Sequence, residues 1–221
     1  MDNIIAYRLG GNNILYLNII KKHACQNSCL FCERPTDGKK LQKLSIYEDG
    51  FSLYRENMPS VEEVITAVKE SIRKSDQLIS FVGLGEPLIY LPEILEMIKE
   101  IKLITDTKIN VNTNGLIESI YPNAAAQLDE VHLDRISISL NATNAEDYQK
   151  VSRSELYNPF PLLLSFIKNC LASKNIETYV SFITDFPYVG VLAEKEEEYL
   201  EFAKSIGLPK ERVRFRKYAK L

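Results

Sequence analysis

Residues 78–87 read Leu78-Ile-Ser-Phe-Val-Gly-Leu-Gly-Glu-Pro87, an apolar run that passes directly into a turn with two glycines. A short apolar run bounded by turn residues is typical of a buried β-strand. The helix that follows begins at Pro92 and has one apolar face, formed by Ile94, Leu95, Ile98 and Ile101. A strand that leads through a turn into an amphipathic helix is the repeating unit of α/β proteins.

The same alternation extends over the rest of the chain. Towards the N-terminus, the pattern predicts a strand over 14–20 and a helix from Ser60, where Ser60 and Glu63 have the spacing of a capping box. Towards the C-terminus, it predicts strands over 108–113, 135–140, 177–183 and 212–218. Six strands that alternate with helices predict a parallel sheet with right-handed crossovers. Because six units are too few for a closed eight-stranded barrel, a partial barrel and a flat doubly wound sheet both remain open.

The second half of the chain carries further helix signals. A short helix is expected near 123–129, and Thr143 and Glu146 have the spacing of a cap for another. A helix over about 194–206 is expected to end at Gly207. The long helix between these two is expected to turn one apolar face inward, formed by Leu162, Leu163, Phe166, Ile167, Cys170 and Leu171.

Length and composition fit one domain over residues 1–221, with a polar loop insertion at about 33–59. The 27 basic and 30 acidic residues give a net charge of −3, which argues against a broad nucleic-acid-binding surface. No apolar run approaches the roughly 18 residues of a membrane span. The N-terminus lacks the pattern of a secretory signal, so a cytoplasmic location is expected.

Three of the four cysteines, Cys25, Cys29 and Cys32, lie within eight residues. Such a Cys-x3-Cys-x2-Cys spacing is expected by chance only about 0.001 times in a chain of this composition, which indicates metal ligands. A cubane iron–sulfur cluster normally takes four cysteines, so three leave one iron open to a substrate or cofactor. Cys170 lies on the apolar face of a predicted helix, where a cysteine is a small buried hydrophobe.

Two other interpretations of the cysteines remain. Cys29 and Cys32 form a Cys-x2-Cys pair after a strand, as in thioredoxin-like redox proteins. Alternatively, His23 and the three cysteines would form a tetrahedral zinc site, although a histidine at a strand end is more often a surface residue.

Polar motifs follow the predicted strands. They are Gly83 to Glu86, Thr113-Asn114-Gly115 and Asn141, and they fall at the carboxyl ends where α/β proteins bind ligands. Alternation along 135–140 separates Ile136, Ile138 and Leu140, expected to face helices, from Ser137, Ser139 and Asn141. Along 212–218, Val213 and Phe215 are likewise separated from Arg214 and Arg216. A polar inner face predicts a polar ligand, while an edge strand in solvent is the alternative for the last strand.

The cysteine motif, with Phe31 directly before the last cysteine, resembles the signature of the radical S-adenosylmethionine (radical SAM) enzymes. The segment 83–87 resembles the Gly-Gly-Glu-Pro motif of that family, with Leu84 placed between the glycines. Residues 113–115 and 138–141 resemble the ends of its third and fourth strands, so the resemblance covers about 14–218. Tyr7-Arg8-Leu9-Gly10 and Leu15-Tyr16-Leu17-Asn18 further resemble the small radical SAM proteins associated with TatD-type hydrolases.

The resemblance implies a partial (βα)6 barrel with outer helices and a 4Fe–4S cluster on Cys25, Cys29 and Cys32. The open iron of this cluster would chelate S-adenosylmethionine, whose reductive cleavage gives methionine and a 5′-deoxyadenosyl radical that abstracts a hydrogen atom from a substrate. The sequence does not identify that substrate. Four cysteines leave no set for a second cluster.

The resemblance also implies which residues bind S-adenosylmethionine. Gly83, Gly85 and Glu86 would meet its ammonium group, and Ser139 and Asn141 its ribose or carboxylate. Asn112, Thr113 and Asn114 would lie at the end of the third strand, although Asn112 also suits a turn cap. Arg214 would pair with the carboxylate of S-adenosylmethionine or with substrate, and its alternative is a solvated basic tail.

A small reductant protein such as ferredoxin or flavodoxin and oxygen-free conditions are implied as well. Two rival functions stay open. One is a non-catalytic zinc- or iron–sulfur-binding redox module. The other is an RNA-modifying member of the family, in which Lys39, Lys40 and Lys43 would touch phosphate rather than lie in a solvated loop.

Overall fold

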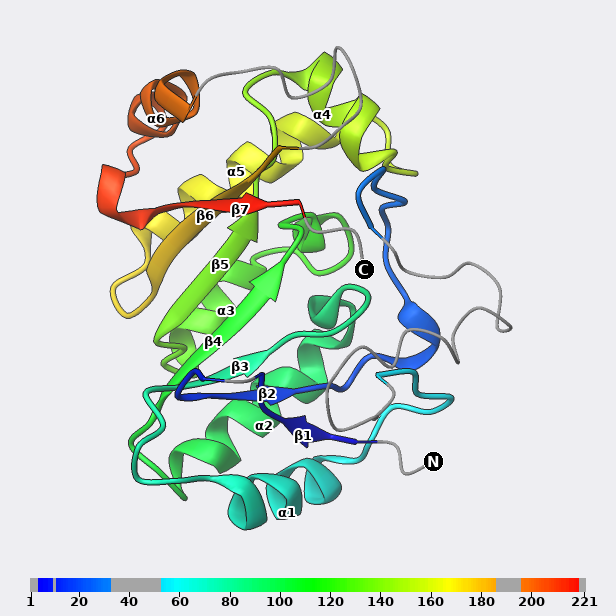
Figure 1. Ribbon diagram of the computed structural model, residues 1–221, viewed down its shortest axis with the longest axis vertical. Coiled ribbons are helices and arrows are strands. Elements are labelled where there is room, and N and C mark those ends of the chain that lie inside the picture. The colour runs from blue at the N-terminus through cyan, green and yellow to red at the C-terminus, as the bar shows by residue number, and fades with distance from the viewer. Residues whose placement is uncertain (1–3, 10, 33–52, 186–195, 219–221) are drawn as a thin grey trace. The chain divides into compact units, whose positions relative to one another are not determined.

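The computed structural model describes residues 4–9, 11–32, 53–185 and 196–218 (Figure 1). Most of the predicted loop insertion at 33–59, with Lys39, Lys40 and Lys43, lies outside the described residues. The chain divides into two compact units. Among the described residues, unit 1 comprises 4–9, 11–25 and 53–112, and unit 2 comprises 26–32, 113–185 and 196–218.

Unit 1 is a sheet with two helices. Its elements are β1 (Ala6–Tyr7), β2 (Ile14–Leu17), η1 (Lys21–His23), α1 (Val61–Ser71), β3 (Leu78–Phe81), η3 (Pro87–Tyr90), α2 (Leu91–Lys102) and β4 (Lys108–Thr113), whose last residue is counted with unit 2. Strands β2, β3 and β4 are parallel, and β1 pairs with β2 in the antiparallel direction. The parallel register places Leu15, Ile79 and Ile109 in one row, and all three are fully buried.

Both helices of unit 1 form where the sequence predicts them. Ser60 Oγ accepts a hydrogen bond from the Glu63 backbone N–H, and the Glu63 carboxylate accepts one from the Ser60 N–H, so the capping box is complete. The apolar face of α2 buries Leu91, Ile94, Met97, Ile98 and Ile101. Each fully buried side chain of this size contributes about 1.5–3 kcal/mol, so this face is the main reason that α2 packs here.

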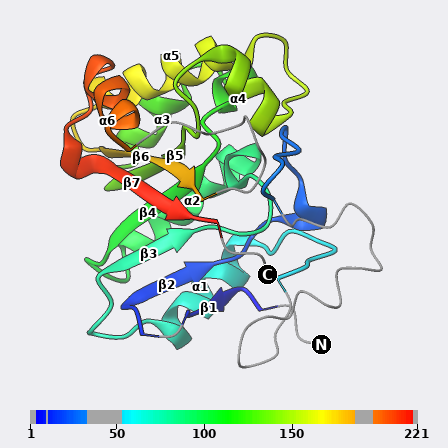
Figure 2. The same ribbon diagram turned by 45° about the horizontal axis from the view of Figure 1, so that its top comes forward.

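Unit 2 repeats the arrangement with three parallel strands. Its elements are η4 (Ile117–Ser119), α3 (Ala124–Glu130), β5 (Arg135–Ser139), α4 (Ala145–Ser152), α5 (Pro159–Ala172), β6 (Glu177–Thr184), α6 (Glu196–Ser205), η5 (Lys210–Arg212) and β7 (Val213–Lys217). Figures 1 and 2 both draw α5 and α6 on the same side of β6 and β7. On that side, the Tyr199 ring of α6 lies 4.3 Å from the Phe182 ring and 6.2 Å from the Phe215 ring.

The predicted α/β class, with six parallel-type strands that alternate with helices, is therefore confirmed. Three details differ. The short strand β1 was not predicted, because two residues are too few for a visible alternation. Leu162, expected to face inward, is 38% exposed. The cap of α4 is Asn144, which accepts from the Asp147 N–H, rather than Thr143 with Glu146.

Within the part of the chain that the structure describes, no helix combines the length and the apolar character that crossing a bilayer requires.

Candidate functional site

The backbone turns sharply just before Cys25. Lys22 and His23 both adopt the left-handed conformation, with φ of 47° and 52°, which is uncommon for residues other than glycine. The Lys22 N–H donates to the Arg55 carbonyl at 2.7 Å, and His23 Nδ1 donates to the Leu84 carbonyl at 2.7 Å. His23 is buried, so its expected place on the surface is wrong. These bonds hold a strained turn, which fixes the position of the backbone just before Cys25.

The glycines of the 83–86 loop allow it to lie against this turn. A Cβ atom at Gly85 would meet the Ala24 carbonyl oxygen at 2.7 Å, and the φ of +148° at Gly85 disfavours any other residue. A Cβ atom at Gly83 would meet Asn18 Oδ1 at 2.8 Å. The Glu86 N–H donates to the Ala24 carbonyl at 2.8 Å. In unit 1, the glycine loop and the chain entering Cys25 are thus one packed structure, as the sequence predicts for neighbouring strand ends.

The Glu86 side chain is 1% exposed. Its carboxylate accepts a hydrogen bond from the Leu88 N–H at 3.0 Å and so caps η3, which begins at Pro87. An acidic group at a helix N-terminus is stabilised by the unpaired N–H groups there. In this structure Glu86 therefore orders the end of the glycine loop.

Asn112 belongs to a row of polar side chains in unit 1. Asn110 Nδ2 donates to Ser80 Oγ at 2.8 Å and to Asn112 Oδ1 at 2.9 Å. Asn110 and Ser80 are almost fully buried, and the sequence-based site omitted both. Strand alternation could have identified Asn110, because residues two apart on a strand, such as Asn110 and Asn112, have their side chains on the same face.

In unit 2, backbone hydrogen bonds tie residues 26–32 to the end of α4. The Ser28 N–H donates to the Ser152 carbonyl at 3.0 Å and the Leu30 N–H to the Val151 carbonyl at 2.9 Å. Asn27 and Ser154 form an antiparallel bridge. Nothing in the sequence marked 151–155 as a support for the cysteines, because backbone bonds leave no residue signature.

The Cys29-Leu30-Phe31-Cys32 segment is itself a closed turn. The Cys32 N–H donates to the Cys29 carbonyl at 3.0 Å, the bond that defines a β-turn. Cys29 and Cys32 therefore lie at the two ends of a hydrogen-bonded turn on an anchored segment.

The motif after β4 contacts the cysteine segment. Asn114 Nδ2 donates to Gln26 Oε1 at 3.0 Å, and Asn114 Oδ1 accepts from the Leu116 N–H at 2.9 Å. Thr113 is buried, and its hydroxyl accepts from the Gly115 N–H at 3.0 Å. Asn114 thus joins the cysteine segment, whereas Thr113 shapes the turn.

The end of β5 is organised by β6. Asn141 lies two residues beyond the last residue of β5, with a left-handed φ of 59°, so strand alternation does not decide where its side chain points. The N–H groups of Leu140 and Asn141 both donate to the Ser181 carbonyl, at 3.0 and 3.2 Å. Ser181 is paired in register with Ser139 and is buried, and the sequence-based site omitted it.

Arg214 lies on β7, on the strand face opposite Val213 and Phe215, as alternation predicts. It is exposed rather than turned to an interior, so the alternative of an edge strand in solvent describes this strand better. Its guanidinium carbon lies 4.8 Å from the centre of the Tyr179 ring. Its Nη1 donates to the carbonyls of Glu211 and Val213, at 2.6 and 3.1 Å. Both acceptors precede Arg214, so the guanidinium is turned towards the start of the strand.

None of the four cysteines is in a disulfide. Cys25 and Cys29 are half-buried and Cys32 is exposed. Cys170 is buried as predicted, and burial raises the pKa of its thiol well above the ordinary value, which makes it a poor ligand.

Among the described residues, no three His, Cys, Asp or Glu side chains are grouped to hold one metal ion. The zinc interpretation, in which His23 and three cysteines share a single ion, is not tested by this observation, because these residues belong to two units. In a cubane cluster each thiolate bonds to a different iron, so its ligands do not converge on one point. Three thiolates are the donor set that such a cluster takes, and the chemistry of these residues fits it.

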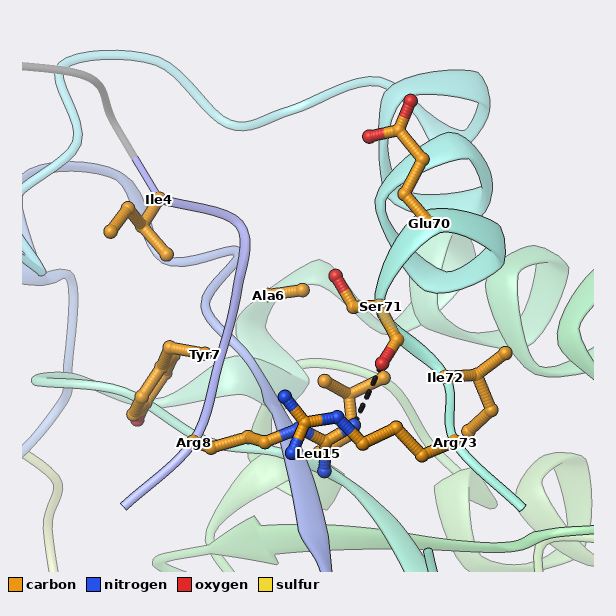
Figure 3. Close-up of a pocket in the computed structure, with 9 residues that line it drawn as sticks. All are labelled: Ile4, Ala6, Tyr7, Arg8, Leu15, Glu70, Ser71, Ile72 and Arg73. Atoms are coloured by element: carbon orange, nitrogen blue, oxygen red, sulfur yellow. Dashed lines mark hydrogen bonds between the residues drawn. The ribbon is translucent and has the colours of Figure 1, made fainter. Parts of the chain in front are cut away.

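Unit 1 also has a pocket of about 490 Å³ beside β1 and the end of α1 (Figure 3). It is lined by Ile4, Ala6, Tyr7, Arg8, Leu15, Glu70, Ser71, Ile72 and Arg73. Arg8 donates to the Ser71 carbonyl and to both carboxylate oxygens of the buried Asp76. No predicted site residue lines this pocket, and Arg8 is already neutralised by Asp76, so the pocket has no evident part in the chemistry.

Comparison with known proteins identifies the family. The model of the radical SAM superfamily matches residues 19–206. A GTP 3′,8-cyclase of Aliarcobacter butzleri is 27% identical over 89% of this chain and 54% of its own length. A protein of Brachyspira hyodysenteriae named GTPase Obg is 28% identical over 68% of this chain and 20% of its own length. The structure of Streptococcus suis SuiB bound to S-adenosylmethionine superposes with a TM-score of 0.63 at 14% identity, over 90% of this chain and 39% of that one.

The chain spans between a fifth and about half of the length of these two curated relatives. The structural likeness supports the fold alone, whereas the family model extends over most of the sequence and both units. The chain belongs to the radical SAM superfamily, whose members use a 4Fe–4S cluster and S-adenosylmethionine.

Proposed function

We propose that this chain binds a 4Fe–4S cluster through Cys25, Cys29 and Cys32 and begins a radical reaction on a substrate. When bound and reduced by an external electron donor, such a cluster would supply the electron that cleaves S-adenosylmethionine to methionine and a 5′-deoxyadenosyl radical, which would take a hydrogen atom from the substrate. One observation carries the proposal. Within unit 1, the residues just before Cys25 are held by a bond from the His23 ring to the Leu84 carbonyl and by one from the Glu86 N–H to the Ala24 carbonyl. Within unit 2, the segment with Cys29 and Cys32 is held by backbone bonds to residues 151–155.

The protein's part is to hold the cofactor and position the reacting groups. We assign the backbone of Gly83, Gly85 and Glu86 to the ammonium group of S-adenosylmethionine. Tight packing on Ala24 supports this assignment, because it fixes the loop next to Cys25.

We assign Ser139 and Asn141 to the ribose or carboxylate of S-adenosylmethionine, and Asn112, Thr113 and Asn114 to the surrounding polar shell. The hydrogen bond from Asn114 to Gln26 supports a place for Asn114 beside the cysteines. Thr113 is proposed to act through the turn that its hydroxyl caps. The carboxylate of S-adenosylmethionine and a substrate group remain the two possible partners of Arg214.

Radical SAM chemistry needs an electron donor, and a ferredoxin or flavodoxin is proposed here. Location in the cytoplasm and oxygen-free working conditions stay predictions, as do a single domain over 1–221 and the finer likeness to TatD-associated proteins. The substrate is unassigned. The cyclase relatives make GTP a first compound to test.

The test is anaerobic reconstitution of the full chain with iron and sulfide, followed by dithionite and S-adenosylmethionine. A cubane cluster gives a brown protein with broad absorption near ~400 nm, and the proposal expects 5′-deoxyadenosine as a product. A colourless protein that binds zinc and yields no nucleoside would instead support the non-catalytic module. An RNA-modifying function would show as a change of RNA mass that depends on S-adenosylmethionine.

A further inference from the structure

The three strands of unit 2 have one face that is not covered by α5 and α6. We name it the polar face of β5–β7. By register and alternation it carries Arg135, Ser137, Ser139, Glu177, Tyr179, Ser181, Ile183, Arg214 and Arg216. The opposite face is apolar, since Phe182 and Phe215 pack against Tyr199 of α6. In register, Ser181 lies beside both Ser139 and Arg214, so these three residues form one row across the strands.

Two guanidinium groups share a single aromatic ring on this face. The guanidinium carbon of Arg135 lies 3.9 Å from the centre of the Tyr179 ring, and that of Arg214 lies 4.8 Å from it. A tyrosine ring attracts each cation through its quadrupole. The two cations repel each other, so their gathering on one ring concentrates positive charge at one place.

The hydrogen-bonding capacity of Arg135 is unused within the described residues. Its Nε atom is buried without a partner, and its guanidinium makes no hydrogen bond or ion pair there. Glu177 stands beside it in register, on the same face of the sheet. Burial is the main reason that the pKa of Arg135 lies below the ordinary value. Tyr179 opposes this shift, Arg214 adds to it, and Glu177 opposes it. An arginine remains charged even so, and a charged donor that is half-buried and unpaired is costly unless a ligand completes it.

Arg214 has spare donors as well. Only its Nη1 makes hydrogen bonds, both to backbone carbonyls, and it has no carboxylate partner among the described residues. The planar guanidinium group presents paired N–H donors that match two oxygens of a phosphate or carboxylate. The buried hydroxyl-bearing Ser181 lies beside Arg214 in register.

We infer that Arg135, Tyr179 and Arg214 form a binding site for an oxyanion, the phosphate or carboxylate group of this enzyme's substrate. The inference rests on the proposed function, because it requires that the chain has a substrate. It also resolves the two possible partners of Arg214. The guanidinium is turned towards the start of β7 and towards the ring that Arg135 shares, and we assign it to the substrate group.

The experiment is an NMR and calorimetric titration of the ¹⁵N-labelled full chain with inorganic phosphate and, separately, with glutarate, at constant ionic strength. The Nε–H resonance of Arg135 is identified as the one missing from Arg135→Lys. We expect at least one of the two anions to shift this resonance. We also expect Arg135→Gln and Tyr179→Leu to weaken its binding by roughly tenfold or more, because a charge-assisted hydrogen bond is lost.

The control is Arg73→Gln, which removes one exposed arginine from unit 1 and should bind the anion as the unaltered chain does. If Arg135→Gln does not fold by circular dichroism, Arg135→Lys replaces it, since lysine keeps the charge but not the paired donors. A response to phosphate alone, or to glutarate alone, supports the site and identifies the substrate group. An unmoved Arg135 resonance with both anions, or equal weakening in Arg73→Gln, overturns the inference. Formation of 5′-deoxyadenosine is measured separately, so either idea can fail without the other.

Discussion

Single glycines explain how closely two segments approach in unit 1. Gly83 and Gly85 are needed for contact with Asn18 and Ala24, whereas the family motif alone suggested only contact with a ligand. Space for a Cβ is absent at both positions because protein atoms already fill it. The same two glycines are therefore required by the packing of unit 1 and by the proposed cofactor site.

Replacing Gly85 by alanine is expected to destabilise the protein strongly. The added Cβ would lie 2.7 Å from the Ala24 oxygen and 2.7 Å from Ile20 Cγ2, and alanine resists a φ of +148°. We expect a loss of about 3 kcal/mol or more in the free energy of unfolding, from strain plus overpacking. Urea unfolding of the metal-free chain measures it.

Gly11→Ala is the matched control for this change. Gly11 also has a positive φ, of +81°, but a Cβ there would meet nothing within 4 Å. Gly11→Ala should therefore lower the free energy of unfolding only by the cost of a positive φ in alanine, about 1–2 kcal/mol. Equal losses in the two variants would show that crowding against Ala24 is not the cause.

The ion pair of Arg8 with Asp76 predicts a pH dependence. Burial opposes ionisation of Asp76, but the Arg8 guanidinium and the Arg73 N–H outweigh it and hold the pKa of that carboxyl below its ordinary value. The unfolded chain then binds the proton more readily, so this stabilisation is complete above the unfolded pKa of about 3.9 and is lost as the pH falls further. Asp76→Asn should cost about 3 kcal/mol at pH 7, because it leaves Arg8 unpaired.

Urea midpoints at pH 5 and pH 3 check the direction. The unaltered chain should lose more stability between these values than Asp76→Asn, which has no carboxyl to titrate at this position. A variant with the same or a steeper loss would contradict the assigned role of Asp76.

At the scale of elements, strong local signals were predicted well and short ones were not. The capping box of α1 and the apolar face of α2 repeat over several residues, so the sequence alone located both helices. The two-residue strand β1 has no such repeat and depends on its pairing with β2. At α4, Thr143 and Asn144 both suit a cap, and only the backbone conformation decides between them.

Asn144 is expected to support the cysteine segment through α4. Its side chain accepts from the Asp147 N–H at 2.9 Å, and the last residues of α4 accept from Ser28 and Leu30. Asn144→Ala should lower the free energy of unfolding by about 1 kcal/mol, and it should speed amide hydrogen exchange at Ser28 and Leu30. Asn144→Asp keeps the acceptor and should restore both values. If exchange at Ser28 and Leu30 were equally fast in Asn144→Ala and Asn144→Asp, the hydrogen bond of the cap would not be what supports the cysteine segment.

At the scale of the whole molecule, topology predicted which motifs belong together and contacts explain why. The alternation of strands and helices placed the motifs at strand ends, and the structure joins 83–86 to Ala24 and Asn114 to Gln26. Asn110, Ser181 and residues 151–155 escaped prediction. Backbone bonds and buried polar rows depend on register, which one sequence does not reveal. Likewise, Arg135 and Tyr179 meet only because β5 and β6 are neighbours.

The four cysteines divide into two kinds, and a pair of variants tests the division. Cys29→Ala removes a proposed ligand from a half-buried turn, so it should abolish the brown colour and 5′-deoxyadenosine formation while leaving the unfolding of the metal-free chain nearly unchanged. Cys170→Ala removes a fully buried sulfur from the apolar face of α5, so it should cost about 1 kcal/mol of stability and leave iron content and product unchanged. Iron analysis, absorption near ~400 nm and urea unfolding of both variants give the comparison. A brown, active Cys29→Ala protein would contradict the cluster assignment, and loss of iron from Cys170→Ala would mean that a fourth thiolate takes part.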